Sequence, residues 1–152
     1  MECGGAVIRR ALLLALSLVV APVLAAGEAR QLVLVASVDS PGRSLSSLET
    51  RMLYLGYAVQ RGRVALRPVR NLSSARVNDV FLQHVVAMTA NAYERRVLVA
   101  MLQKGREPPL EVRSVPELVR VLERDPRAVS YLWQEEALRY PGLQVLRVLW
   151  VE

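Results

Sequence analysis

Short apolar runs alternate with amphipathic segments along most of the chain. Residues 32–38 form a nearly continuous apolar run, LVLVASV, followed by the turn sequence DSPG. This pattern predicts a strand buried on both faces of a sheet. Three further apolar runs predict strands, at residues 64–69, 128–132 and 143–149. Pro68 predicts that the first of these three lies at a sheet edge or ends there.

The segments between these strands carry helix signals. Ser46 and Glu49 have the spacing of a capping box, in which each side chain satisfies a free backbone N–H at the helix start. Gly56 predicts the end of that helix, since glycine readily adopts the left-handed conformation. The predicted apolar stripe consists of Leu48, Met52 and Leu55.

Three more helices are predicted downstream. Ser73 or Ser74 caps the first, whose apolar face contains Val77, Val80, Phe81 and Val85. Thr89 caps the second, which ends at Gly105 and has Tyr93, Val97 and Met101 on one face.

Pro108 and Pro109 then predict an extended link. Ser114 and Glu117 form a second capping box, Pro116 suits the first turn, and the apolar positions are Leu118, Val119 and Leu122. Asp125 and Pro126 stop this helix. Strands that alternate with helices in this way predict an α/β fold with a mixed sheet covered by helices.

The N-terminal residues have the three parts of a cleavable signal peptide. Arg9 and Arg10 precede an apolar stretch at residues 11–20, and Ala25 and Ala26 offer a cleavage site. The alternative is a permanent anchor, but the apolar run is shorter than the roughly 20 residues that a spanning helix needs. We therefore expect residues 1–26 to be removed on export to the periplasm, and residues 27–152 to form one domain.

The cysteine content and the net charge further limit the class of protein. The single cysteine, Cys3, lies in the predicted signal, so the exported domain would have neither disulfide nor thiolate metal site. The net charge is +6, and removal of Glu2, Arg9 and Arg10 would lower it to about +5. Genome base composition can explain the excess of arginine; attraction to anions is the functional alternative. The arginines are scattered without interleaved aromatic residues, which argues against nucleic acid as a partner.

Residues that could carry catalysis are few. His84 is the single histidine, and without clustered carboxylates it does not predict a metal site. No nucleophile elbow is present, and Glu135 and Glu136 are adjacent, so they predict a solvated helix surface rather than a carboxylate pair. We expect neither a catalytic site nor a cofactor.

One segment has the chemistry of an anion site. Arg70, Ser73, Ser74 and Arg76 lie where a predicted strand ends and a helix begins. Free N–H groups at a helix start favour negative charge, and arginine side chains suit a phosphate or a carboxylate. The alternative is an ordinary serine cap flanked by solvated arginines.

Four segments follow one another in a distinctive order and spacing: LVLVASVDSPGRSLSSLETRMLYLG, RGRVALRPV, VRNLSSARVNDVFLQHVV and KGREPPLEVRSVPELVRVLERDPRAVSYL. Together they resemble the phosphate-type periplasmic solute-binding proteins of ABC transporters. The chain is similar to short relatives that keep one lobe of this type 2 periplasmic-binding-protein fold. Its Ser73-Ser74-Ala75 stands where the family has Ser-Gly-Thr, so a glycine and a hydroxyl are missing.

This resemblance implies a non-catalytic exported protein that binds phosphate or another small oxyanion weakly, linked to an ABC-type phosphate uptake system. The implied ligand residues are Arg70, Ser73, Ser74 and Arg76. The alternative is an accessory module that kept the fold without ligand binding and docks on an envelope partner such as a membrane permease or a sensor.

Overall fold

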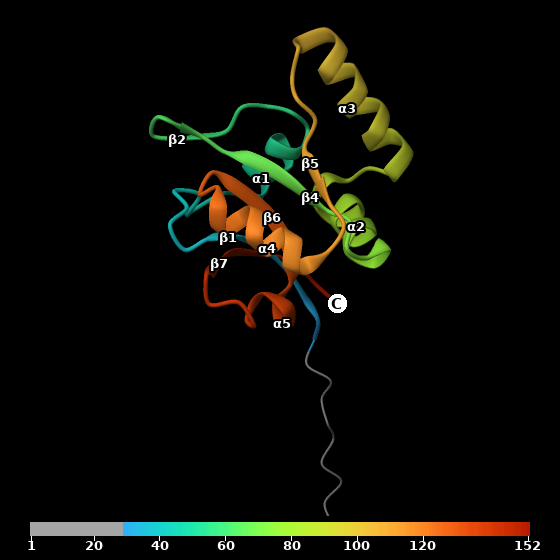
Figure 1. Cartoon of the computed structure of the whole chain (residues 1–152). Helices are drawn as coiled ribbons and strands as arrows, with labels where there is room; N and C mark the ends of the chain where they lie inside the picture. Colours follow the sequence, from blue (N-terminus) through green and yellow to red (C-terminus); the bar gives the residue numbers. More distant parts are fainter. Residues whose placement is uncertain (1–28) are drawn as a thin grey trace, which may run out of the picture.

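A computed structural model describes residues 29–152, so the predicted signal peptide, residues 1–26, lies outside the described part. The main sheet has five strands and carries helices on both faces (Figure 1). Its strands are β1 (Gln31–Ser37), β4 (Arg67–Asn71), β5 (Leu110–Val112), β6 (Ala128–Trp133) and β7 (Leu143–Val151). The predicted α/β fold class is therefore confirmed.

The sheet is mixed, with the order β5-β4-β6-β1-β7. β4 runs parallel to β5 and β6, whereas β1 runs antiparallel to β6 and β7. The first strand of the domain is thus held between the last two strands. β2 (Gln60–Arg61) and β3 (Val64–Ala65) form a separate hairpin that turns at Gly62, whose φ is +60°.

β1 is buried on both faces, as its apolar run predicts. Leu32 and Leu34 point to one core and Val33 and Val35 to the other, because successive side chains of a strand alternate. Three aromatic rings pack together in the first core. Phe81 stacks on Tyr131 with 3.7 Å between ring centroids, and Tyr54 meets both rings edge-on.

Within residues 29–152, five α-helices and one π-helical turn connect the strands: α1 (Ser47–Tyr54), α2 (Ala75–Phe81), η1 (Leu82–Val86), α3 (Ala90–Lys104), α4 (Val115–Arg124) and α5 (Gln134–Ala137). The first core takes its helical side chains mainly from α1, α2 and η1, and the second takes them from α4 and α5. α3 stands out from this body, beyond the β5 side of the sheet (Figure 1).

The predicted helix caps have different outcomes. Ser46 and Glu49 form the capping box: the Glu49 N–H donates to Ser46 Oγ at 3.1 Å and the Ser46 N–H donates to Glu49 Oε2 at 2.8 Å. Ser74 and Thr89 accept from the N–H groups of Val77 and Ala92. The prediction of a capping box at Ser114 is wrong. Ser114 is the N-cap, but its side chain makes no cap hydrogen bond. Pro116 in the first turn and Leu118, Val119 and Leu122 in the core are confirmed.

Three local expectations are corrected. Leu48 is 68 % exposed rather than part of a buried stripe, because α1 turns Leu53 and Tyr54 inward. The predicted strand at residues 64–69 is split between β3 and β4. β4 lies inside the sheet, and its Pro68 is tolerated near the strand start, since β5 pairs with β4 only from Val69 onward.

Side chains complete the junction between β4 and β6. Backbone register joins these strands only at Arg67–Ala128 and Pro68–Val129. Next to the last of these pairs, the buried Tyr54 hydroxyl lies 3.0 Å from the carbonyl oxygens of both Val69 and Val129. Ser130 Oγ donates to Val69 O at 2.9 Å, and Asn71 Nδ2 donates to Tyr131 O at 2.9 Å. Buried carbonyls thus find partners without a regular ladder.

Among residues 29–152, none of the helices has the length and apolar character needed to cross a membrane.

Candidate functional site

The four predicted anion-site residues lie at the end of β4 and the start of α2. Arg70 is in β4, Ser73 and Ser74 are in the connecting turn, and Arg76 is in the first turn of α2. The predicted strand-to-helix junction is therefore present. The side chains of its two arginines, however, are directed at carboxylates of the protein itself.

Arg70 is nearly enclosed, with only 6 % of its side chain exposed. Its Nη1 donates to Glu94 Oε1 and to Glu111 Oε1, each at 2.7 Å, and its Nη2 lies 3.3 Å from Asn78 Oδ1. The guanidinium also lies over the ring of Tyr93, 4.8 Å from its centroid. One arginine thus joins β4 to β5, α2 and α3.

The electrostatics keep this arginine charged. Burial by itself lowers the pKa of Arg70, but the hydrogen bond and charge of Glu94, together with Tyr93 and Tyr131 nearby, more than offset burial, so the pKa lies above its ordinary value. For the Tyr93 hydroxyl, by contrast, burial raises the pKa. This hydroxyl donates to Tyr54 O at 2.9 Å. The cluster is a fixed positive charge held between two negative charges.

The remaining predicted residues also have partners. The Ser73 N–H donates to Asn71 Oδ1 at 2.9 Å, and Ser74 Oγ accepts from the N–H of Val77. Arg76 pairs with Glu152. These interactions are those of an ordinary helix cap with an exposed ion pair, which was the alternative left open by the sequence.

A groove lies beside Arg70, between α3 and the chain that leads into β5. It has a volume of about 510 Å³ and combines the Arg70, Glu94 and Glu111 cluster with apolar walls. The apolar walls are Val97, Leu98, Met101, Pro108 and Pro109. Ser73, Ser74 and Arg76 do not line it, so the structure does not bring the four predicted residues together in one cavity.

Sequence reasoning missed Glu94 and Glu111 as partners of Arg70. Glu94 follows Arg70 by 24 positions and Glu111 follows by 41. Glu111 lies next to Arg70 in the parallel register of β4 and β5. Residues 110–112 were expected to form an extended link rather than a strand. The sequence therefore contained no signal for the pairing of Arg70 with Glu111.

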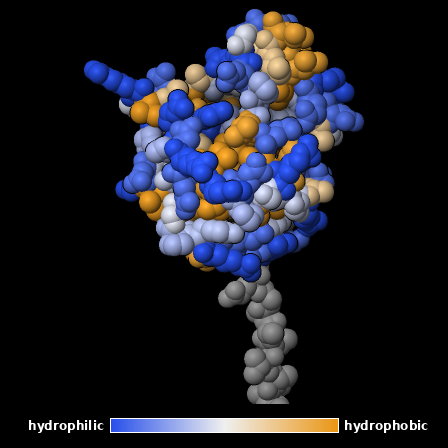
Figure 2. All heavy atoms as spheres, viewed as in Figure 1, coloured by the Kyte–Doolittle hydropathy of each residue, from blue (hydrophilic) through white to orange (hydrophobic). Residues whose placement is uncertain are grey.

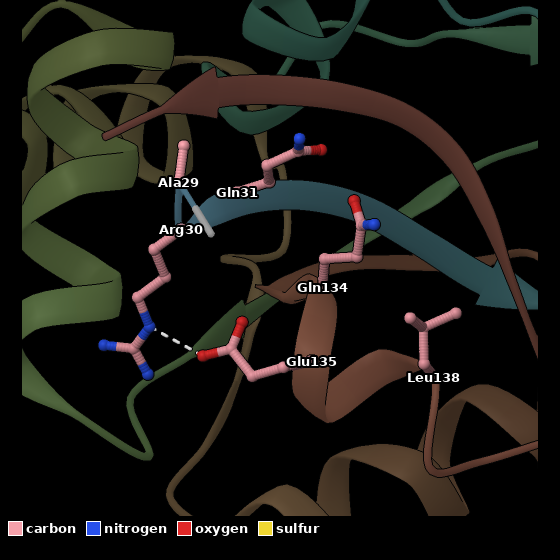
Figure 3. Close-up of a pocket in the computed structure, with 6 residues that line it drawn as sticks. All are labelled: Ala29, Arg30, Gln31, Gln134, Glu135 and Leu138. Carbon is pink, nitrogen blue, oxygen red and sulfur yellow. Dashed lines mark hydrogen bonds and ion pairs between the residues drawn. The ribbon is translucent and has the colours of Figure 1, made fainter. Parts of the chain in front are cut away.

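A second hollow, of about 660 Å³, lies at the start of β1 beside α5 (Figure 3). Across it, Arg30 Nε donates to Glu135 Oε1 at 2.6 Å, and the Arg30 guanidinium lies over the Trp133 ring at 4.2 Å. Arg30 and Glu135 pair with each other, and Gln31, Gln134 and Leu138 add no nucleophile or general base.

Residues that could hold a metal are not grouped in the described part: residues 29–152 contain no cluster of three or more histidine, cysteine, aspartate or glutamate side chains. His84 is exposed on η1 and stacks on Trp150, with 4.9 Å between ring centroids. Trp150 packs against the first core, so His84 lies at the edge of that core.

Comparison with known proteins gives a distant likeness. The sequence matches no protein-family model and no curated protein. Among solved structures, the chain is similar to an ABC-type phosphate transport receptor from Vibrio cholerae, with a TM-score of 0.48 and 11% sequence identity. The match covers 79% of this chain and 46% of the receptor chain, so the chain spans less than half of the receptor's length.

Proposed function

We propose that this protein is an exported, non-catalytic interaction module of the cell envelope. It uses an α/β domain of the solute-binding type to dock on a partner such as a membrane permease or a sensor. The signal-like N-terminal residues support export. The positive charge of Arg70 in the predicted anion site is already paired with carboxylates of the protein itself. This pairing supports docking on a partner over capture of a solute.

The single observation that carries this proposal is the pair of 2.7 Å contacts from Arg70 Nη1 to Glu94 and Glu111. A bound oxyanion would have to displace these carboxylates or lie beside them. At about 5 Å and an effective dielectric constant near 20, each carboxylate would repel a unit negative charge by about 3 kcal/mol. The repulsion is comparable to the about 1.5–3 kcal/mol contributed by a charged hydrogen bond, so little affinity remains.

The second candidate is weak binding of a small oxyanion, phosphate first, at Arg70, Ser73, Ser74 and Arg76. One observation favours it: Arg70 Nε is buried without a hydrogen-bond partner in the described structure. The Glu94 side chain is 56 % exposed, and its rotation toward solvent would free one face of the guanidinium.

Calorimetry and thermal melting with phosphate, sulfate and acetate separate the two candidates. We expect no saturable heat and no change in melting temperature at millimolar anion. Saturable heat that Ser74→Ala weakens and Arg70→Met abolishes, while Arg63→Ala leaves it unchanged, would establish the solute-binding function instead. Arg63 suits this comparison because it is exposed in the turn between β2 and β3 and does not line the groove.

A further inference from the structure

β7 forms one edge of the main sheet and is long for that position. It has nine residues, whereas β5 at the opposite edge has three. Within residues 29–152, the backbone of residues 144–151 is hydrogen-bonded only to β1. Its N–H and C=O groups that point away from β1 are therefore available to a further strand. Charges and proline often protect such an edge, but residues 143–151 contain one charged side chain, Arg147, and no proline.

Two irregularities in β7 bring its exposed valines to one face. The β1 partners of Val145, Val148 and Val151 are residues 35, 33 and 31, which share a face because side chains of a strand alternate. A register shift adds one β7 residue within each interval. The three valines therefore share a face although they are three positions apart. They are 42 %, 45 % and 50 % exposed in chain order.

The order of the two faces along β7 is symmetric about Val148. Val145, Val148 and Val151 lie on the face of the second core, like their β1 partner Val33. The two residues on either side of Val148 lie on the face of the first core. These four residues are Leu146, Arg147, Leu149 and Trp150.

This symmetry makes β7 complementary to a second copy of itself. Two antiparallel copies related by a two-fold axis at Val148 place every side chain opposite one on the same face. Val148 then lies opposite Val148 of the second copy, and Val145 lies opposite Val151. Side chains that are directly opposite in an antiparallel pair approach within about 4.5–5.5 Å at Cβ, so the exposed valines cover one another.

The charges of the strand are compatible with this pairing. Arg147 lies opposite Leu149 of the second copy, and Glu152 lies opposite Gln144. The two copies of Arg147 are diagonal rather than opposite, and each donates through Nη1 to Leu45 O of its own chain at 3.3 Å. No like charges are therefore directly opposed, which is the arrangement that destabilises a strand pair. A lipid bilayer fits this edge less well, because it offers no partner to free backbone groups.

We infer that β7 is the self-association edge of this protein. Two copies pair their β7 strands antiparallel about Val148, so that the two five-stranded sheets join into one continuous sheet. Backbone hydrogen bonds connect the copies, and the valines bury one another on the face of the second core. The dimer forms without a ligand or an envelope partner, so its test is independent of the proposed function.

Sedimentation velocity of the purified protein over a range of concentrations tests this inference. We expect a monomer–dimer equilibrium that tightens at higher salt, since each chain carries a net charge of +6 and salt screens the repulsion. Val148→Lys places two like charges opposite each other and should weaken the dimer at least about tenfold. Val99→Lys is the matched control and should dimerise like the native protein. Val99 is a similarly exposed valine on α3, where other apolar side chains are also exposed (Figure 2).

A mixture of two variants tests the two-fold axis itself. Val148→Glu alone should also weaken the dimer, whereas an equimolar mixture with Val148→Lys should restore it, because lysine then lies opposite glutamate. Mixing would not restore a dimer that was lost through unfolding. A chain that stays monomeric up to millimolar concentration, a dimer that survives Val148→Lys, or a mixture that remains monomeric would overturn the inference. A dimer that Val99→Lys abolishes would place the contact on α3 instead.

Discussion

Arg70 Nη1 and Glu94 Oε1 lie 2.7 Å apart and join the interior of the sheet to the second turn of the projecting helix α3. The same guanidinium holds Glu111 in β5, so one buried cation contacts both ends of the segment from Glu94 to Glu111. The position of α3 therefore depends on this charge pairing as well as on the packing of Tyr93 and Val97 in the first core.

Glu94→Ala should loosen α3 while leaving the sheet intact. The carboxylate is more than half exposed, so solvent screening limits its contribution to about 1 kcal/mol. That corresponds to roughly fivefold faster amide exchange in α3, measured by hydrogen–deuterium exchange, with β1 and β6 unchanged. Glu107→Ala is the control, because Glu107 is exposed and forms no ion pair in the described structure. Equal exchange in both variants would show that Glu94 does not hold α3.

Tyr54→Phe should destabilise the fold although it removes only one oxygen atom. The hydroxyl lies 3.0 Å from the carbonyl oxygens of Val69 and Val129, at the junction where β4 and β6 lack a regular ladder. Loss of this buried donor should lower the free energy of unfolding by about 1–3 kcal/mol. Urea unfolding measures the change, with Tyr140→Phe as the control on a tyrosine outside this network. A loss for Tyr54→Phe no larger than that of the control would mean that water replaces the hydroxyl.

Ser46→Ala and Ser114→Ala should differ although both serines are helix N-caps. Ser46 forms the reciprocal bonds with Glu49, whereas the Ser114 side chain makes no cap hydrogen bond. We expect a loss of about 1 kcal/mol in unfolding free energy for Ser46→Ala and at most a few tenths for Ser114→Ala. Thermal melting of both variants side by side checks this. A larger loss at Ser114 would contradict the observed geometry.

Acid should remove the contribution of Glu49 to stability. The hydrogen bonds from Arg61, followed by that from the Ser46 N–H, lower the pKa of Glu49 from 4.5 to about 2. Because the folded pKa is the lower one, the stabilisation is fully present above about pH 4.5 and is lost as pH falls toward 2. Glu49→Gln should therefore flatten the dependence of unfolding free energy on pH between 5 and 2, by urea titrations at each pH. A profile parallel to that of the native protein would rule out this contribution.

Much of the fold was predictable because its signals are local. The run at residues 32–38 is apolar at both odd and even positions, and two-sided burial of β1 follows from that alone. The Ser46 cap and the left-handed ends at Gly56 and Gly105 depend on nearest neighbours in the chain. These features were therefore readable before any tertiary contact was known.

The candidate site was not predictable in the same way. Arg70 was expected to be a free cation, yet the partners that neutralise it come from α3 and β5, and three-residue β5 gave no strand signal. Leu48 was expected inside because its spacing fits a stripe, but α1 buries Leu53 and Tyr54 to reach the aromatic stack. Contacts between segments that are far apart in the sequence decided both outcomes.

The place of β1 between β6 and β7 has a consequence for biosynthesis. These two neighbours begin at Ala128 and Leu143, so the hydrogen bonds of β1 form only after residues 128–151 have left the ribosome. Contacts of such long sequence separation form slowly, since a large loop must close first. A growing chain of this protein therefore lacks both neighbours of β1 until residues 128–151 have been synthesised, the condition in which a polypeptide can still be threaded through a narrow translocation pore.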